Sequence, residues 1–255
     1  MEKSKKIINI WEYNWIMFWW KADNLNYLYQ KWFNIANGFC ISSHSIDKKL
    51  IEEYYERFII SDKYIIRSSA NCEDWKKLSY AWMFKSIEWK YKNWLLHNNI
   101  KKVFDSINNS FLDMYEKNII GKIIKNRKMN VLIQEYIVWD YSWVYLSNIN
   151  DERVLWIIKW WNKLLVDWQV NWINIYMNKN FKIIKQEYNI QEKILDWNFN
   201  ILEYNKKVII ENKLFLNLIK EFIKIEKIFN FDVDIEWTIK EDKIYILQVR
   251  PITIN

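Results

Sequence analysis

The sequence predicts an α+β protein with two lobes. Helical periodicity dominates the first half of the 255-residue chain. After about residue 130, Val- and Ile-rich strand patterns take over, and the chain closes on two neighbouring strands. We expect one domain over residues 1–255, with approximate lobes at 1–128 and 129–255. Hydrophobic residues make up 51% of the chain and charged residues 27%, which is typical of a globular protein.

Helices are predicted where apolar residues recur every three or four positions. In the middle of the chain Phe104, Ile107 and Phe111 share one helical face, and near its end Leu218 and Phe222 do the same. The predicted helices span residues 21–30, 46–58, 100–119 and 211–229.

Strands are predicted where Val and Ile gather over short runs. The predicted strands span residues 63–67, 131–138, 144–149, 154–159, 232–239 and 243–250. The last two are almost adjacent, so we expect an antiparallel hairpin, with a three-residue loop over 241–243.

The two faces of this hairpin differ in chemistry. With that loop, the odd positions of both strands are apolar and form a core face, which includes Tyr245 and Leu247. The polar side chains at even positions converge on the other face, namely Asp234, Glu236, Gln248 and Arg250.

Two carboxylates two residues apart, opposite an amide oxygen, predict a site for a hard divalent cation such as Mg²⁺. An adjacent arginine suits the phosphate that such a cation carries. The alternative is a solvated hairpin face with a Glu/Arg pair across the strands, which contributes little.

The counts of tryptophan and glycine are abnormal. The chain has 18 Trp and only 2 Gly, whereas glycine usually makes up roughly 7% of residues. We hypothesise that many of these tryptophans are glycine in the native protein, because a UGA codon is read as Trp by the translation table that gave this sequence and as Gly by the organism. The alternative is a Trp-rich surface that stacks on sugars.

Charge and cysteine content limit the partners and the compartment. The net charge of +7 suits an anionic partner such as a nucleotide, but it is spread along the chain and does not indicate nucleic acid. The two cysteines cannot form a disulfide framework, so we expect a reducing, cytoplasmic compartment. The start of the chain is too polar for a signal peptide, and no apolar run is long enough to span a membrane.

Several segments, in order along the chain, resemble a known nucleotide-binding domain. Residues 19–25 become GGKADNL when Trp is read as Gly, 66–74 read IRSSANCED, and the chain ends with DIEW at 234–237 and LQVRPIT at 247–253. This order resembles the ATP-binding (PEP/pyruvate-binding) domain of the pyruvate phosphate dikinase / phosphoenolpyruvate synthase family, which has an ATP-grasp-type fold. Weaker resemblances lie at residues 33–42, 78–86, 131–144 and 164–170.

The resemblance implies a role for each matching residue. Lys21, Arg67 and Arg250 would neutralise the phosphates of ATP and act in catalysis. Glu236 and Gln248 would ligate Mg²⁺. Asp234 would join those ligands or hold a polar edge of the nucleotide. The remaining nucleotide contacts would come from a hinge strand facing adenine and from a lid loop in which the family has glycine at the position of Trp82. The hinge residues are Gln134, Glu135, Tyr136 and Ile137. Trp237 lies where the family itself has Trp or Gly, so it is a candidate native tryptophan.

The family moves phosphate onto a histidine of a separate domain. This chain has only 2 His, His44 and His97, and His44 is expected to be a surface histidine. The resemblance therefore implies a half-reaction, in which a phosphoryl or pyrophosphoryl group passes from ATP to a histidine on a partner protein. The alternatives are a regulatory ATP-binding module without transfer, and a basic, aromatic-rich binder of glycans or nucleic acid.

Overall fold

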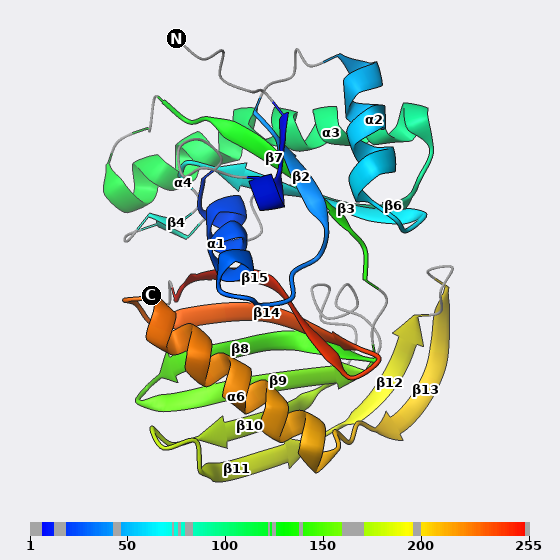
Figure 1. The fold of residues 1–255 in the computed structure, drawn as a ribbon. Coiled ribbons are helices and arrows are strands. Elements are labelled where there is room, and N and C mark those ends of the chain that lie inside the picture. Colours follow the sequence, from blue (N-terminus) through cyan, green and yellow to red (C-terminus); the bar gives the residue numbers. More distant parts are fainter. Residues whose placement is uncertain are drawn as a thin grey trace. The chain divides into compact units, whose positions relative to one another are not determined.

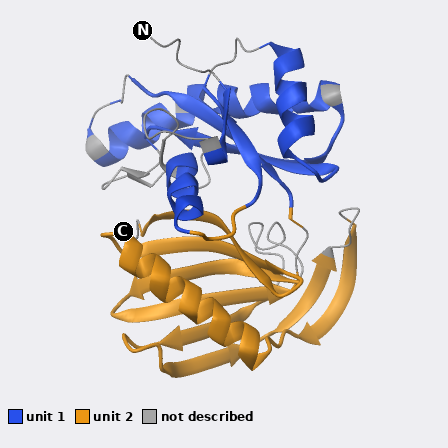
Figure 2. Ribbon diagram, viewed as in Figure 1, with its two compact units in different colours: residues 1–31, 36–136, 253–255 blue, residues 32–35, 137–252 orange. Residues whose placement is uncertain are grey.

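A computed structural model gives the structure of the protein, and its described residues form two compact units. Unit 1 comprises residues 1–31, 36–136 and 253–255, and unit 2 comprises 32–35 and 137–252 (Figure 2). Each unit combines helices with antiparallel strands, so the predicted α+β class is confirmed. The described residues are 7–12, 19–42, 47–72, 74–75, 78–79, 84–121, 123, 126–137, 140–159, 171–195 and 200–252.

Unit 1 is built on a five-stranded antiparallel sheet in the order β1-β2-β7-β3-β6 (Figure 1). Its strands are β1 (Ile7–Asn9), β2 (Gly38–Ile41), β3 (Lys63–Ala70), β6 (Ser86–Lys90) and β7 (Met129–Glu135). Its helices are α1 (Trp19–Gln30), α2 (Lys48–Phe58), α3 (Asn93–Asp105) and α4 (Ser110–Ile120). Two short 3-10 turns, η1 (Ile10–Glu12) and η2 (Ser106–Asn108), and the small pair β4 (Asp74–Trp75) and β5 (Leu78–Ser79) complete it.

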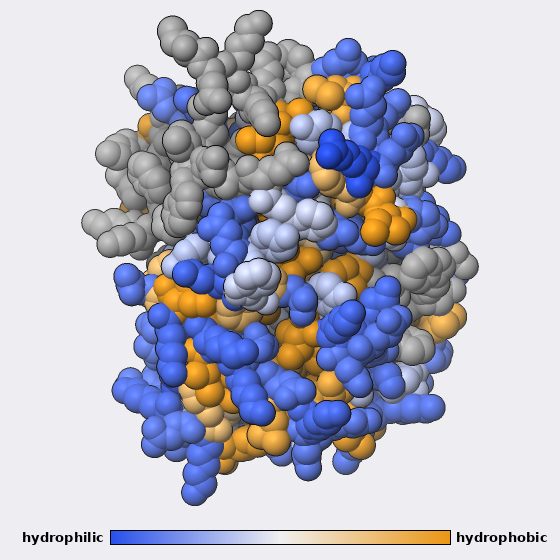
Figure 3. Space-filling view, in the orientation of Figure 1, coloured by the Kyte–Doolittle hydropathy of each residue, from blue (hydrophilic) through white to orange (hydrophobic). Residues whose placement is uncertain are grey.

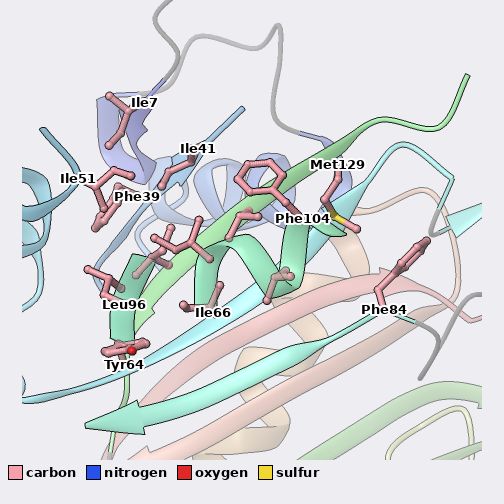
Figure 4. Close-up of a cluster of buried hydrophobic side chains, with 14 of the residues drawn as sticks. Ile7, Phe39, Ile41, Ile51, Tyr64, Ile66, Phe84, Leu96, Phe104 and Met129 are labelled. Carbon is pink, nitrogen blue, oxygen red and sulfur yellow. The ribbon is translucent and has the colours of Figure 1, made fainter. Parts of the chain in front are cut away.

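One face of this sheet carries the hydrophobic core of unit 1. Tyr64 and Ile66 of β3 are fully buried there and cluster with Leu96 and Phe104 of α3 (Figure 4). Because side chains alternate along a strand, Arg67 lies on the opposite face of β3. The apolar positions of β3 thus fix the face on which its arginine is presented.

Local capping breaks the helix predicted over residues 100–119. The side chain of Asn109 accepts a hydrogen bond of 3.0 Å from the backbone N–H of Phe111 and so begins α4. The hydroxyl of Ser106 donates to the carbonyl of Val103 at 2.6 Å, at the end of α3. The prediction of one continuous helix was wrong because hydrophobic periodicity continues across a break that these polar side chains make.

Unit 2 is built on a six-stranded antiparallel sheet in the order β11-β10-β9-β8-β14-β15, crossed by α6 (Asn212–Ile228) (Figure 1). The Phe222 ring of α6 stacks on Tyr145 with centroids 4.3 Å apart and lies 6.1 Å from the Trp237 ring. The strands of this sheet are β8 (Tyr141–Ile149), β9 (Glu152–Lys159), β10 (Ile173–Met177), β11 (Ile183–Tyr188), β14 (Val233–Lys240) and β15 (Lys243–Pro251). A separate pair is formed by β12 (Ile190–Leu195) and β13 (Ile201–Lys207).

The change of unit falls later than the change of sequence pattern. β7 pairs with both β2 and β3 and therefore belongs to unit 1. The expected lobe boundary at 128/129 follows the start of Val-rich sequence, whereas the structure divides the chain after residue 136. The strands β10 to β13 had no counterpart in the prediction.

The surface drawn in Figure 3 mixes hydrophilic residues with patches of hydrophobic ones. In the part of the chain that the structure describes, no helix is both long and apolar enough to cross a bilayer.

Candidate functional site

The hairpin of β14 and β15 turns more tightly than expected. Lys240 lies directly opposite Lys243, so the turn contains only Glu241 and Asp242. Both have positive φ, 49° and 62°, as a type I′ hairpin turn requires. The prediction of a three-residue loop was wrong, because neither residue is the glycine or asparagine that usually marks this turn.

A β-bulge restores the register of the polar residues. Glu236 pairs with Gln248 and Trp237 pairs with Ile246, so Leu247 is the extra residue on β15. In an uninterrupted hairpin with this turn, Glu236 would lie opposite Leu247, and Gln248 would point to the other face. The bulge therefore brings Gln248 onto the face of Glu236.

The four expected polar side chains thus share one face of unit 2. Asp234 lies opposite Arg250, two residues along from the Glu236–Gln248 pair. The predicted core face was wrong between the bulge and the turn. There Ile246 shares a face with buried Trp237, and Tyr245 lies opposite Thr238 on the other face.

Asp234 and Arg250 form a largely buried ion pair. The Arg250 Nε donates to Asp234 Oδ2 at 2.8 Å, and Asp234 is 8% exposed. Burial raises the pKa of the Asp234 carboxyl; nearby Arg250 opposes that shift and Glu236 adds to it. The pair holds the guanidinium in place through Nε, and its planar fork suits phosphate oxygens.

The donor set of this face fits Mg²⁺. The Asp234 Oδ1 is buried and has no hydrogen-bond partner among the described residues, so one hard oxygen donor is left over beside Glu236 and Gln248. No group of three or more His, Cys, Asp or Glu side chains in the described ranges could hold a metal ion. Mg²⁺ characteristically takes one or two carboxylates and completes its shell with water and substrate phosphates.

Unit 1 carries the other expected phosphate-binding groups. The Lys21 Nζ of α1 donates to the Ser68 backbone carbonyl at 3.0 Å and lies 3.4 Å from its hydroxyl. Ser68 directly follows Arg67, which is 8% exposed. The structure thus brings Lys21 next to the strand segment that bears Arg67. That these groups and the hairpin act on one triphosphate stays a prediction.

Gln134 lies on the same face of the unit 1 sheet as Arg67. Gln134 lies opposite Ile65, and Leu132 lies opposite Arg67. Gln134 is therefore diagonal to Arg67, two residues away on the neighbouring strand and on the same face. Gln134 is 1% exposed, and within the described part of the chain its Nε2 has no hydrogen-bond partner. A buried amide of this kind is suited to binding a polar ligand.

Two backbone N–H groups of the expected hinge strand already donate hydrogen bonds within unit 1. The N–H of Glu135 donates to the Asn37 carbonyl at 2.8 Å, and the N–H of Tyr136 donates to the Lys63 carbonyl at 3.1 Å. Tyr136 and Ile137 are buried, and burial raises the pKa of the Tyr136 hydroxyl, with Glu88 adding to the shift. An adenine contact from this segment would therefore come from other backbone groups than these two amides.

Three expected features lie outside the described residues, namely Trp82, His44 and segment 164–170. His97 Nε2 lies 2.8 Å from Glu52 Oε1 and so joins α3 to α2. This contact gives His97 a structural partner in unit 1.

Sequence reasoning missed the structural role of Gly38. It pairs with Gln134, and a Cβ at Gly38 would overlap the carbonyl oxygen of Ile133. Glycine is therefore required for β2 to lie this close to β7. The presence of glycine at this position, in a chain with only 2 Gly, was the signal that could have revealed this role.

Comparisons with known proteins point to nucleotide chemistry. The family model described as "Pyruvate phosphate dikinase, AMP/ATP-binding domain" matches residues 20–255. No curated protein matches the chain.

Among solved structures, D-alanine–D-alanine ligase from Bacillus anthracis is similar with 8% identity and a TM-score of 0.41, over 90% of this chain and 55% of that one. The Helicobacter pylori enzyme shows 11% identity and a TM-score of 0.42, over 88% and 48%. The chain thus spans about half the length of these ligases.

Proposed function

The chain belongs to the pyruvate phosphate dikinase AMP/ATP-binding domain family, and from this premise we propose that it is an ATP- and Mg²⁺-dependent phosphotransferase domain. It would transfer a phosphoryl or pyrophosphoryl group from ATP to a histidine on a partner protein, as in phosphoenolpyruvate synthase. The observation that carries the proposal is the shared face of Asp234, Glu236, Gln248 and Arg250, whose register depends on the bulge at Leu247.

The basic side chains bind and orient the phosphates in this proposal. Arg250, held by Asp234, offers its guanidinium to two phosphate oxygens. Lys21 and Arg67 contribute further positive charge from unit 1. In phosphoryl transfer the protein acts mainly by positioning and by stabilising negative charge, and these groups suit that task.

The oxygen-bearing side chains of the hairpin would hold the metal. Glu236 and Gln248 would supply ligand oxygens, and Asp234 Oδ1 would be the further donor. A metal held there would supply positive charge to neutralise the phosphates.

Adenine recognition is assigned to residues 134–137. The buried amide of Gln134 and the apolar side chain of Ile137 suit the polar edge and the faces of a purine. Because the N–H groups of Glu135 and Tyr136 are engaged, the Gln134 side chain becomes the stronger candidate for a polar contact.

The acceptor is assigned to another chain. His97 is paired with Glu52, and His44 is expected to be a surface residue, so neither is proposed as the phosphorylated histidine. Cys40 and Cys72 are both buried and form no disulfide, which fits the proposed cytoplasmic location.

The substitution Glu236→Gln tests the metal site. It removes one charge with little change of shape, and we expect Mg²⁺-dependent ATP affinity to fall about tenfold or more, since about 1.4 kcal/mol corresponds to tenfold. Calorimetric titration of ATP with and without Mg²⁺ measures this.

Glu241→Gln is the matched control. Glu241 lies in the turn of the same hairpin and is exposed, so its removal should leave ATP affinity unchanged. Equal loss in both variants, or loss in neither, would contradict the proposed metal site.

A further inference from the structure

Two tryptophans hold backbone conformations that favour glycine. Among the described residues with positive φ, Trp32 has φ 68° and Trp143 has φ 151°. Side chains with a Cβ rarely adopt such angles, and bulky residues do so least often. Most of the other positive-φ residues are Asn or Asp, which tolerate the left-handed region, or lie in the hairpin turn.

Trp32 occupies the position at which helices end on glycine. It follows α1, whose last residue is Gln30. Trp32 lies two residues beyond Gln30 and Gly121 directly follows α4, and the φ of 69° at Gly121 almost equals that of Trp32. The Trp32 side chain is 95% exposed, so no burial offsets the unfavourable conformation. A left-handed residue just beyond a helix is thus glycine in one case and tryptophan in the other.

Trp143 lies within a strand next to the candidate metal site. Its backbone pairs with that of fully buried Trp237 on β14, and the next residue, Val144, pairs with Glu236. Yet the Trp143 ring packs against Trp156 at 5.1 Å and Trp172 at 4.6 Å. Glycine within a strand characteristically adopts such φ values at irregular positions.

We infer that glycine is the native residue at positions 32 and 143, inserted at UGA codons that the translation table behind this sequence reads as Trp. The conclusion joins the backbone angles to the composition of 18 Trp and 2 Gly. Trp237 is assigned as a native tryptophan, since it is fully buried against Phe222 and its φ is not positive. The assignment concerns the identity of the polypeptide and does not depend on the proposed function.

Paired substitutions test the backbone part of this inference. At positions 32 and 143 the Gly variant should melt higher than the Ala variant, by about 2–4 °C for each kcal/mol of relieved strain. Both variants remove the indole, so their difference isolates the backbone. Thermal unfolding of the full chain measures it.

Two tryptophans in ordinary conformations serve as controls. Trp94 of α3 is exposed like Trp32, and Trp156 of β9 contacts Trp143. At both, the Ala variant should melt higher than the Gly variant, because glycine weakens helix and strand interiors. Ala melting at or above Gly at positions 32 and 143 would overturn the inference.

Peptide mass spectrometry of the protein from its own source organism decides the residue identity directly. It also keeps the inference testable if the tryptophan-containing chain does not fold. We expect glycine at positions 32 and 143 and tryptophan at 237. Tryptophan at either of the first two positions overturns the inference.

Discussion

At the scale of single residues, the Asp234–Arg250 pair links stability to the proposed binding site. A buried carboxylate that accepts one charged hydrogen bond and keeps its second oxygen unpaired is costly for the fold alone. The same geometry leaves an oxygen donor beside Glu236 and fixes the Arg250 guanidinium. Such a cost is expected at a ligand site rather than in a purely structural pair.

The raised pKa of Asp234 predicts a pH dependence of stability. A carboxyl whose folded-state pKa lies above its usual value of 3.8 stabilises the fold below that value and loses this contribution as pH rises through the folded pKa. The free energy of unfolding of the parent chain minus that of Asp234→Asn should therefore fall with pH and then level off. Denaturant unfolding across a pH series measures this difference. A difference that grows with pH would show that Arg250 outweighs burial.

The proposed need for a planar guanidinium at position 250 is also testable. Arg250→Lys keeps the charge but removes the planar fork and its Nε bond to Asp234, so we expect ATP affinity to fall about tenfold. Arg57→Lys on α2 is the control, because Arg57 lies over the Phe58 ring and has no assigned ligand role. Similar affinities of the Arg250→Lys chain and the parent would argue against a bidentate phosphate contact.

At the scale of elements, α6 supports the strand that carries the carboxylates. Its buried stripe packs on β8 and β14 through Phe222, which contacts Tyr145 and Trp237. A second anchor lies between Tyr145, Arg153 and Glu226, where Arg153 donates to both carboxylate oxygens of Glu226 at 3.0 and 2.7 Å. The helix therefore fixes one face of the sheet while the polar quartet uses the other.

Truncation of Phe222 should weaken this support. Phe222→Ala removes a fully buried ring and should cost about 3–5 kcal/mol of unfolding free energy. Leu216→Ala, at an exposed position on α6, should cost far less. Denaturant unfolding followed by tryptophan fluorescence compares the two. Equal costs would mean that α6 does not anchor the sheet through Phe222.

At the scale of the whole molecule, the residues proposed to bind phosphate are divided between the units. Lys21 and Arg67 belong to unit 1, and the hairpin quartet belongs to unit 2. The acceptor histidine is assigned to a partner, so turnover should depend on a second protein.

Addition of a phosphohistidine-domain partner should reveal that dependence. ATP with this chain alone should yield little AMP or ADP. ATP with the partner should yield AMP and a pyrophosphorylated histidine on the partner, or ADP and a phosphorylated one. Chromatography of nucleotides and mass analysis of the partner measure both products. AMP formed at the same rate without the partner would indicate a different acceptor.

Long amphipathic helices and Val- or Ile-rich strands were predictable from periodicity. The predictions for α1, α2, α6, β3, β7, β8, β9, β14 and β15 are confirmed to within a few residues. The missed strands β11 to β13 carry many exposed, charged residues and lack the alternation that one buried face produces.

The candidate site was only partly predictable. The residue types of the quartet and their spacing along each strand are properties of the sequence alone, because side chains alternate in any extended strand. Gln134 was expected as part of a hinge through its backbone. Only the structure showed that its side-chain amide is buried, at the position opposite Ile65.

The sequence by itself determined the α+β class, the polar side chains of the final hairpin and the excess of tryptophan over glycine. Only the tertiary structure decided that a bulge at Leu247 offsets the two-residue turn and pairs Glu236 with Gln248. It also decided that Trp32 and Trp143 hold glycine-like angles. Local pattern sets which residues are available, whereas register and backbone angles depend on contacts between distant segments.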